Sequence, residues 1–364
     1  MADNIRAGIL GTGFMGRVHG QAILAAGARV VGVVGRTHDS GTEAALRYPH
    51  ATGFATVDAL LDAGVDVVHV CLPNALHHEA SRTLIAAGVA VVCEKPLATS
   101  LQDAADLTDA AADAGIVTGV PFVYRYYPVV REIRRRLRRD GSRLWLLHGS
   151  YLQDWLASRH ATNWRVEPSA GGRSRAFGDI GIHWCDLMEY VTGHRITRLS
   201  ARLGNAFDRE GGPEQNLTED GGLITFETDA GAIGSLVISQ VSAGRRNRLW
   251  FSFDGPEVSY SFNQESPESM WVGLPSEAHV VDRDPSSGGE QSRRSNALPP
   301  GHPQGYQHCF NDFVADTYAA IRGDDPGDRP QFADGLRAAQ LTEAVLTSTT
   351  SRSEWIDVPA AGQD

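Results

Sequence analysis

The fold of the first part of this chain is decided by the stretch Arg6-Ala7-Gly8-Ile9-Leu10-Gly11-Thr12-Gly13-Phe14-Met15-Gly16. Residues 6–10 predict a short apolar strand, which runs directly into the pattern G-x-G-x-x-G. Apolar residues recurring over 18–26 then predict a helix that ends at Gly27. Glycines let the backbone approach a pyrophosphate, and the free N–H groups at a helix N-terminus bind it. This context predicts a dinucleotide-binding Rossmann domain with cofactor contacts from Gly11, Gly13, Phe14, Met15 and Gly16.

The next strand, predicted over residues 28–34, bears on the choice between NAD and NADP. Its end normally carries an acid for the ribose 2′-hydroxyl, whereas here it reads Val33-Val34-Gly35-Arg36-Thr37-His38. The first acid is Asp39, beyond the predicted strand. Gly35 removes a charge that would repel a 2′-phosphate, and Arg36 and Thr37 can pair with one. The pattern favours NADP over NAD; the alternative is that Arg36 stacks on the adenine.

Strands and helices keep alternating up to residue 119, which predicts an open α/β sheet. Strands are expected at 65–70, 89–93 and 116–119, and helices at 75–87 and 101–114. Two strand exits carry polar residues, namely Leu72-Pro73-Asn74-Ala75-Leu76-His77 and Glu94-Lys95-Pro96. Ligands lie outside the carboxyl ends of strands in such sheets, so Lys95 can reach a substrate oxygen. The alternatives are a surface cap for Lys95 and a solvated helix start for His77.

The stretch Gly178-Asp179-Ile180-Gly181-Ile182-His183-Trp184-Cys185-Asp186 carries a second group of polar residues. If it starts a helix running to about Thr192, Asp179 and His183 stand at i and i+4 on one face, which Asp186 and Tyr190 join. A separate apolar stripe holds Ile180, Trp184, Leu187, Met188 and Val191, with Gly193 as the stop. An imidazole suits proton transfer at a hydroxyl, and a neighbouring carboxylate can orient or charge it. The alternative is an exposed polar face with an ordinary Asp–His pair.

Composition limits the class of protein. A chain of 364 residues with 42% hydrophobic and 21% charged residues predicts two packed globular domains rather than disorder. The net charge of −11 argues against a general binder of nucleic acid or anionic membranes. No apolar run is long enough to span a membrane, and the start lacks a signal-peptide pattern. Four scattered cysteines without metal or disulfide spacing fit a cytoplasmic location and no metal site.

The motifs occur together in an order that resembles one family, the Gfo/Idh/MocA oxidoreductases. They are the glycine-rich turn, the Pro73-Asn74-x-x-His77 exit, Glu94-Lys95-Pro96, and Asp179-x-Gly-x-His183. The resemblance implies an α/β Rossmann domain over 1–122 and an α+β domain with a large, mostly antiparallel open sheet over 123–364. It places the last helices near the domain junction. It implies the catalytic residues Lys95, Asp179 and His183, and further cofactor contacts from Leu72, Pro73, Asn74, His77, Glu94 and Lys95.

Beyond residue 119 the resemblance places the stretch 120–128 near the substrate, so Tyr124 and Arg125 are candidate substrate-binding residues. Six arginines between 131 and 139 flank one apolar stripe, and we interpret them as a solvated helix rather than a nucleic-acid patch. Asp154, Trp155 and Trp164 follow a strand expected at 144–151. They suit a sugar ring, although loop tryptophans also pack locally. Arg173 and Arg175, in the glycine-rich run before Gly178, could bind a substrate anion or a cofactor phosphate.

Strand-like runs recur at 196–203, 222–228, 232–240, 248–253 and 257–262, separated by turn residues as in an antiparallel sheet. Residues 274–300 are poor in apolar side chains and predict a long exposed loop, which could reach a partner subunit. Helices are expected at 306–321 and 332–349. His302 and Tyr306, just before the first of these, are minor candidates for the substrate pocket.

Together these features predict NAD(P)-dependent, reversible oxidation of a secondary hydroxyl on a sugar, glycoside or cyclitol such as inositol. His183 would act as the general base, Lys95 would stabilise the oxygen, and Asp179 would orient His183 or hold a neighbouring hydroxyl. Two alternatives stay open: an NAD-dependent glycosidase that oxidises and eliminates, and a cofactor-binding regulator without turnover. The resemblance also predicts a homodimer or homotetramer built through the second sheet.

Overall fold

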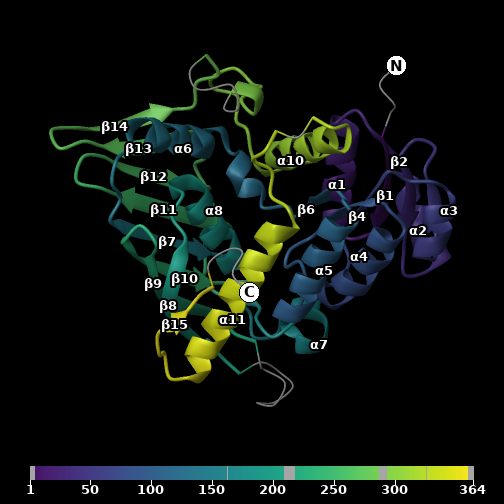
Figure 1. Cartoon of the computed structure of the whole chain (residues 1–364), viewed down its shortest axis with the longest axis horizontal. Coiled ribbons are helices and arrows are strands. Elements are labelled where there is room, and N and C mark those ends of the chain that lie inside the picture. The colour runs from purple at the N-terminus through teal and green to yellow at the C-terminus, as the bar shows by residue number, and fades with distance from the viewer. Residues whose placement is uncertain (1–4, 162, 209–217, 287–292, 325, 360–364) are drawn as a thin grey trace. The chain divides into compact units, whose positions relative to one another are not determined.

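The computed structural model describes residues 5–161, 163–208, 218–286, 293–324 and 326–359 (Figure 1). The chain forms two compact units. The first contains Met1–Val123 and Tyr306–Leu336, and the second contains Tyr124–Gly305 and Arg337–Asp364. The first unit therefore takes up a helix from the far end of the chain as well as the segment that contains the glycine-rich turn.

The first unit is a six-stranded parallel sheet in the order β3-β2-β1-β4-β5-β6. Its strands are β1 (Arg6–Leu10), β2 (Arg29–Val34), β3 (Thr52–Phe54), β4 (Val67–Val70), β5 (Ala90–Cys93) and β6 (Thr118–Gly119). Every residue of β4 and β5 is buried, as expected for strands covered on both faces. This sheet confirms the predicted doubly wound domain.

The helices of this unit follow the strands along the chain. They are α1 (Phe14–Ala25), α2 (His38–Ala45), α3 (Val57–Asp62), the 3₁₀ turn η1 (Asn74–Leu76), α4 (His77–Ala86), α5 (Leu101–Asp113) and α10 (Tyr306–Ile321). Helix α10 packs on α1, where the Gln307 side chain donates to the Val18 carbonyl at 3.1 Å. Helix α11 (Phe332–Thr350) begins in this unit and ends in the second.

The segment between β2 and β4 holds α2, β3 and α3, to which the sequence patterns assigned no structure. In this segment the backbones of neighbouring elements lie so close together that some positions have no room for a side chain. A Cβ added at Gly53 would lie 2.2 Å from the Thr42 nitrogen, so α2 and β3 can touch only because Gly53 has none. Short elements joined by such contacts leave little periodicity to detect.

The second unit contains a nine-stranded sheet in the order β14-β13-β12-β11-β7-β10-β9-β8-β15. The strands are β7 (Leu146–Leu152), β8 (Ile196–Gly204), β9 (Gly221–Thr228), β10 (Ile233–Ser239), β11 (Arg248–Asp254), β12 (Ser259–Asn263), β13 (Ser269–Gly273), β14 (Ala278–Asp282) and β15 (Ile356–Asp357). Only the pairing of β7 with β10 is parallel among the described strand pairs of this sheet. The predicted large, mostly antiparallel sheet is confirmed.

One face of this sheet is a packed aromatic core. The rings of Phe251 and Phe253 stack with centroids 4.1 Å apart, and Phe262 and Phe226 are also buried. Helices α6 (Pro128–Asp140) and α8 (Ile182–Thr192) pack against each other and on β12 and β7 (Figure 1). The buried Trp184 of α8 donates its indole N–H to the Trp250 carbonyl at 2.9 Å. Helix α8 is thereby anchored to the centre of the sheet.

Short helical turns complete the second unit: η2 (Val123–Tyr126), η3 (Trp164–Val166), α7 (Pro168–Gly171) and the π-helical turn η4 (Phe177–Gly181). The predicted exposed loop at 274–300 is wrong in part, because it contains β14 and the buried Arg283. Arg283 donates to Glu268 at 2.7 Å and to the carbonyls of Leu298 and His302 at 2.8 Å. Residues 287–292 of that segment lie outside the described residues.

The arginine run of α6 also differs from the predicted solvated helix. Arg131 and Arg134 are each 8% exposed. The Arg131 guanidinium carbon lies 4.2 Å from the Tyr126 ring centroid, and that of Arg134 lies 3.7 Å from the Tyr190 ring centroid. A guanidinium is weakly hydrated and stacks on aromatic faces, so these two arginines can be buried where lysines could not.

Candidate active site

The glycine-rich turn has the geometry of an anion cradle. Gly11 has φ of 109°, and a Cβ added there would lie 2.4 Å from the Cys71 carbonyl oxygen. A Cβ added at Gly16 would lie 2.2 Å from the Gly11 carbonyl oxygen. Gly13 is the N-cap of α1, and no side chain caps this helix. A Cβ added at Gly13 would meet no atom of the described residues within 4 Å. The N-terminus of α1 therefore presents free N–H groups to open space, which fits a dinucleotide pyrophosphate.

The end of β2 shows why an acid is missing there. A Cβ added at Gly35 would lie 2.3 Å from the Ser40 hydroxyl and 2.4 Å from the Gly41 nitrogen. The start of α2 thus occupies the space that a side chain would need. Arg36 and Thr37 are exposed, and Thr37 caps α2 by accepting a hydrogen bond from the Ser40 N–H at 3.2 Å. Of Gly35, Arg36 and Thr37, the residues predicted to discriminate NADP from NAD, only Arg36 has a charged side chain, and that side chain is exposed.

The exits of β4 and β5 are tied together by His77. Its side chain is fully buried, with Nε2 2.9 Å from the Leu72 carbonyl oxygen and Nδ1 2.8 Å from the Pro96 carbonyl oxygen. Burial lowers the pKa of His77 more than these two carbonyl contacts raise it. The alternative of a solvated helix start is therefore wrong, and His77 links the segment of Asn74 to the segment of Lys95.

Lys95 follows β5 at this linked edge. It is the only lysine in the 364-residue chain, whose Lys and Arg residues number 33 in total. Its backbone N–H donates to Glu94 Oε2 at 3.1 Å. Glu94 is 5% exposed and also accepts a hydrogen bond from His19 Nε2 at 3.0 Å. The lysine thus stands on a segment whose backbone is anchored in the protein interior.

In the second unit the predicted catalytic helix begins with a π-helical turn rather than a regular α-helix. Asp179 lies in η4 and His183 in α8. A Cβ added at Gly181 would lie 2.4 Å from the Phe177 ring, so this turn needs glycine. The predicted apolar stripe is confirmed, with Ile180, Trp184, Leu187, Met188 and Val191 all buried. Gly193 closes the helix in the left-handed conformation at φ of 76°, as predicted.

A buried carboxylate, Glu219, holds the start of this turn. It accepts hydrogen bonds from the Ser174 hydroxyl at 2.7 Å, the Phe177 N–H at 2.8 Å and the Arg175 N–H at 3.1 Å. The Arg175 side chain is 2% exposed and pairs with Asp220. The prediction that Arg175 binds an anion is therefore wrong, because its guanidinium is buried in an ion pair.

Asp179 and His183 have different surroundings. Asp179 Oδ2 accepts from Gln240 Nε2 at 2.7 Å, and its other oxygen lies 3.8 Å from Arg165 Nε. Gln240 is fully buried at the end of β10. The His183 ring is 7% exposed and meets the Tyr124 ring edge to face at 5.0 Å. The alternative of an exposed polar face does not hold for His183.

A hydrogen-bonded network continues from Tyr124. Its hydroxyl bonds that of Tyr151, which in turn donates to Asn247 Oδ1 at 2.8 Å. Gln153 donates to the same Asn247 oxygen at 2.7 Å and accepts from the Trp155 indole at 2.8 Å. The network joins two predicted substrate residues, Tyr124 and Trp155, through three that the sequence did not single out. Uncharged polar residues in strands and loops have no periodic signal that would have identified them.

The other candidate substrate residues have local partners. Arg125 Nε donates to Asp186 at 2.9 Å, and its guanidinium lies 5.0 Å from the Tyr190 ring. Asp154 lies 3.1 Å from Arg246, and Trp164 stacks with Arg165 at 4.4 Å. In the second unit, His302 is exposed near the Pro300 carbonyl. In the first unit, Tyr306 starts α10 against Phe310. Their roles as substrate contacts stay predictions.

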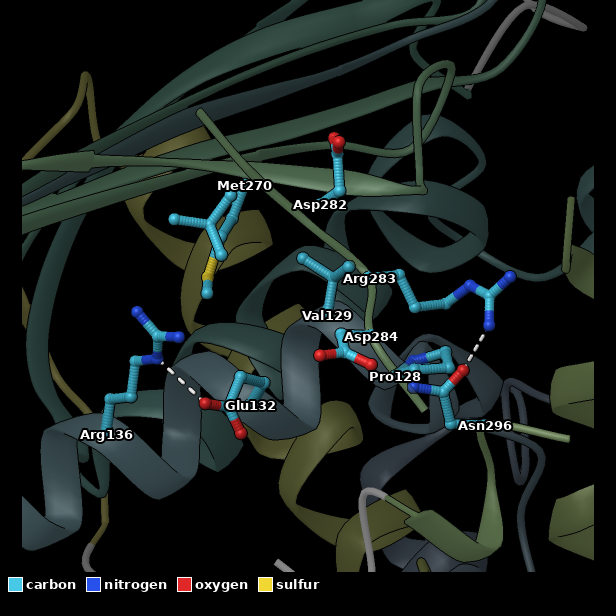
Figure 2. A pocket seen from close by; sticks show the side chains of 10 residues that line it. Pro128, Val129, Glu132, Arg136, Met270, Asp282, Arg283, Asp284 and Asn296 are labelled. Atoms are coloured by element: carbon cyan, nitrogen blue, oxygen red, sulfur yellow. Dashed lines mark hydrogen bonds and ion pairs between the residues drawn. The ribbon is translucent and has the colours of Figure 1, made fainter. Parts of the chain in front are cut away.

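The second unit also has a pocket, which none of these candidate residues lines (Figure 2). It is lined by Pro128, Val129, Glu132, Arg136, Met270, Val281, Asp282, Arg283, Asp284 and Asn296. Both arginines of the pocket already have partners, with Arg136 on Glu132 at 2.8 Å and Arg283 on Asn296. Among the described residues there is no group of three or more His, Cys, Asp or Glu side chains suited to a metal ion. No helix in the described part of the chain has the length and apolarity to cross a membrane.

Comparison with known proteins identifies both parts of the chain. Residues 5–122 match an oxidoreductase family with an NAD-binding Rossmann fold, and residues 135–260 match the GFO/IDH/MocA C-terminal domain. The chain is 28% identical to levoglucosan dehydrogenase of Pseudarthrobacter phenanthrenivorans, covering 98% of this chain and 99% of that one. It is 26% identical to scyllo-inositol 2-dehydrogenase (NAD(+)) of Bacillus subtilis, covering 66% and 69%. These matches confirm the resemblance that the motifs suggested.

Solved structures agree over nearly the whole chain. An oxidoreductase domain protein from Kribbella flavida is 31% identical with a TM-score of 0.88, covering 98% of this chain and 100% of that one. Levoglucosan dehydrogenase in complex with NADH and L-sorbose is 27% identical with a TM-score of 0.89, covering 99% and 100%.

The contact between Gln240 and Asp179 makes a testable prediction. Replacing Gln240 with Glu puts a second carboxyl group where Nε2 now lies 2.7 Å from Asp179. Two carboxylates so close cannot both ionise, so one acquires a raised pKa in the folded state. The stability of the variant is then retained at low pH. It is lost as the pH rises from the carboxyl pKa of the unfolded state, about 4, through the raised pKa of the folded state. We expect the variant to lose more free energy of unfolding, relative to the parent, at about pH 8 than at about pH 5 in urea titrations.

The matched control is Gln240→Glu combined with Asp179→Asn, which removes one of the two carboxyl groups and should remove the pH dependence of the loss. An equal loss at both pH values in the single variant would contradict the contact.

Proposed function

The chain belongs to the Gfo/Idh/MocA family of NAD-binding oxidoreductases, and on this premise we propose that it oxidises a secondary hydroxyl of a sugar, glycoside or cyclitol reversibly. The relatives named above are dehydrogenases of levoglucosan and of scyllo-inositol, which supports a polyhydroxylated ring as the substrate class. The observation that carries the proposal is Lys95, because a chain that uses arginine at every other cationic position keeps its one lysine at the carboxyl end of a Rossmann strand.

We propose the following division of work among the residues. His183 takes the proton of the substrate hydroxyl as general base, a role typically worth about 10²–10⁴-fold in rate. Lys95 donates to the same oxygen as negative charge develops on it. Asp179, oriented by Gln240, holds His183 or a neighbouring hydroxyl. When bound, the nicotinamide supplies the hydride-accepting carbon.

The cofactor would be held at the N-terminus of α1 by Gly11, Gly13, Phe14, Met15 and Gly16. The strand-exit residues Leu72, Pro73 and Asn74 would border it, and Arg36 with Thr37 would meet the adenosine ribose. The tight, uncapped turn supports this placement of the pyrophosphate.

Two other functions are distinguishable by simple measurements. A cofactor-binding regulator needs the glycine-rich turn alone, so retention of Lys95, Asp179 and His183 argues against it. A glycosidase that oxidises and then eliminates would hold its NAD through gel filtration and would turn over without added cofactor. Assays of inositols, hexoses, glycosides, levoglucosan and L-sorbose with NAD and NADP, followed by absorbance of the reduced nicotinamide, separate these possibilities.

The first prediction concerns catalysis. His183→Ala should lower kcat by roughly 10²–10⁴-fold while cofactor affinity stays nearly unchanged, because the base is lost and the Rossmann contacts are not. Lys95→Ala should also lower kcat, by about 10²–10³-fold. Because both residues act on one oxygen, the double variant should lose far less than the product of the single losses.

The pH profile of oxidation should fall on its acid side, where a protonated imidazole cannot accept the hydroxyl proton. Near-parental turnover and the same acid limb in His183→Ala would show that another group is the base, with Tyr124 or Asp179 as the next to test.

The second prediction concerns the cofactor. NADP should bind more tightly than NAD by calorimetry, since β2 ends without an acid and Arg36 is exposed beside the start of α2. Arg36→Ala should shrink that preference. An aspartate at Gly35 is a poor complement to this test because the Ser40 and Gly41 atoms occupy its space. Equal or tighter binding of NAD by the parent, in line with the NADH held by its levoglucosan dehydrogenase relative, would overturn the preference.

The third prediction concerns assembly. The outer face of the second sheet exposes Leu223, Ile233, Val237, Trp271 and Val280. Leu223 is paired with Val237, and Trp271 with Val280, so these side chains gather on one face. An exposed apolar face of this kind is usually covered, and we propose that a second copy of the chain covers it.

Light scattering at micromolar concentration should therefore give a dimer or tetramer. Val237→Asp should weaken it, because association would bury an unpaired charge. Leu46→Asp is a matched control, since Leu46 is 82% exposed in the first unit. A monomeric parent would rule out the assembly.

A further inference from the structure

A chain of buried polar side chains ends at the carboxylate next to the only lysine. Tyr318 of α10 lies with its hydroxyl 2.8 Å from His69 Nε2, and His69 Nδ1 lies 2.8 Å from His19 Nδ1. His19 Nε2 lies 3.0 Å from Glu94 Oε1. Tyr318, His69 and His19 are each 0% exposed. We propose that His19 is a positioning residue for Lys95, acting through Glu94 and held in place by His69 and Tyr318; this rests on the proposed catalytic role of Lys95.

The hydrogen bonds in this chain run in one direction. Burial raises the pKa of the Glu94 carboxyl, but His19, Lys95 and His77 together lower it by more, so its pKa lies below the usual value. Glu94 is therefore ionised and can only accept hydrogen bonds. His19 must therefore carry a proton on Nε2. The second nitrogen of the His19 ring, Nδ1, lies 2.8 Å from His69 Nδ1, and when it carries no proton it accepts from His69 Nδ1–H. Burial holds the pKa of His69 well below its usual value, so this ring is neutral and its Nε2 accepts from Tyr318, whose pKa burial raises.

The same carboxylate fixes the backbone of the lysine. Glu94 uses Oε1 for His19 and Oε2 for the Lys95 N–H at 3.1 Å. On the other side of Lys95, the Pro96 carbonyl contacts the buried His77 at 2.8 Å. The residues that precede and follow Lys95 are thus each held by a buried imidazole. A misplacement of about 1 Å at a reacting group can cost about 10²-fold in rate, so this support matters for turnover.

His19 also connects the lysine to the candidate cofactor site through a single rigid element. It lies in α1, whose N-terminus carries the glycine-rich turn. Its ring packs against those of His69 and Phe310, with centroid distances of 5.1 Å and 5.0 Å. The helix that presents its N–H groups at one end therefore also presents His19 to Glu94.

The test uses Lys95 as its own reporter. Reductive methylation with ¹³C-formaldehyde labels the α-amino group and one lysine, so the NMR spectrum of the cofactor-free protein contains a single dimethyl-lysine signal. In His19→Leu, Glu94 loses the donor on Oε1 and is no longer held from α1, and we expect the lysine signal to move toward that of a free dimethyl-lysine. We also expect kcat in the unlabelled enzyme to fall by about 10²-fold with a smaller change in cofactor affinity.

His19→Gln distinguishes positioning from general damage to the fold. The glutamine amide can donate to Glu94 while its oxygen accepts from His69, so both the signal and kcat should return toward the parental values. His78→Leu is the matched control: His78 pairs with Asp106 at 2.8 Å and is not a member of this chain of hydrogen bonds, so the substitution should leave the signal unchanged.

Glu94→Gln serves if His19→Leu fails to fold. Its amide oxygen keeps an acceptor for His19, but the amide nitrogen that replaces Oε2 cannot accept a hydrogen bond from the Lys95 N–H, so the lysine signal should shift as in His19→Leu. A parental signal and parental kcat in either His19→Leu or Glu94→Gln would overturn the proposal. Lys95→Ala with parental turnover would instead contradict the catalytic role of Lys95, and the NMR signal would still report whether His19 positions it.

Discussion

Two buried carboxylates that require hydrogen-bond donors set the positions of both candidate catalytic segments. An ionised carboxylate removed from water costs several kcal/mol unless donors surround it. Glu94 receives its donors from His19 and the Lys95 N–H. Glu219 receives three, from Ser174, Arg175 and Phe177, at the start of the turn that contains Asp179. Glu94 thus accepts from the backbone N–H of Lys95 itself, and Glu219 from that of Phe177, two residues before Asp179, so neither backbone segment can move without leaving a buried carboxyl oxygen short of a donor.

This arrangement explains how groups on loop and turn segments can be held as firmly as groups on regular elements. Electrostatic catalysis depends on donors that are in place before the reaction, and a site is as precise as the groups behind it. Lys95 follows a fully buried strand, and the carboxylate before it is fixed from α1. His183 is clamped by the Tyr124 ring, and Asp179 by the buried Gln240. Stability and positioning are therefore served by the same contacts.

Sequence patterns were sufficient wherever a feature depends on neighbours within one element. The glycine-rich turn, the apolar stripe of α8 with its glycine stop, and the strand alternation of both sheets were predicted because each repeats over a few residues. Groups that meet across the fold were not predicted. His69 and Tyr318 are far apart in the chain and share no pattern. The π-helical turn at Asp179 replaces the predicted regular helix, and the Phe177 ring lies where a Cβ at Gly181 would be, a contact that residue spacing alone does not reveal. The arginines of α6 were expected in solvent because the aromatic faces that bury them lie on other segments.

The arginines of this chain and its single lysine stand in different kinds of position. Arg283 bridges a carboxylate and several carbonyls, Arg337 pairs with Glu189 at 2.8 Å, and Arg134 stacks on Tyr190. These tasks need a planar group with several donors, which a guanidinium supplies and an ammonium does not. An ammonium is instead a compact charge on a flexible stem, with three donors that can be directed at a single oxygen. A chain that solves its structural problems with arginine has no structural need for lysine. The one lysine that it keeps follows a buried strand beside the linked exits of β4 and β5, where its proposed task is to donate a hydrogen bond to a substrate oxygen as negative charge develops on that oxygen.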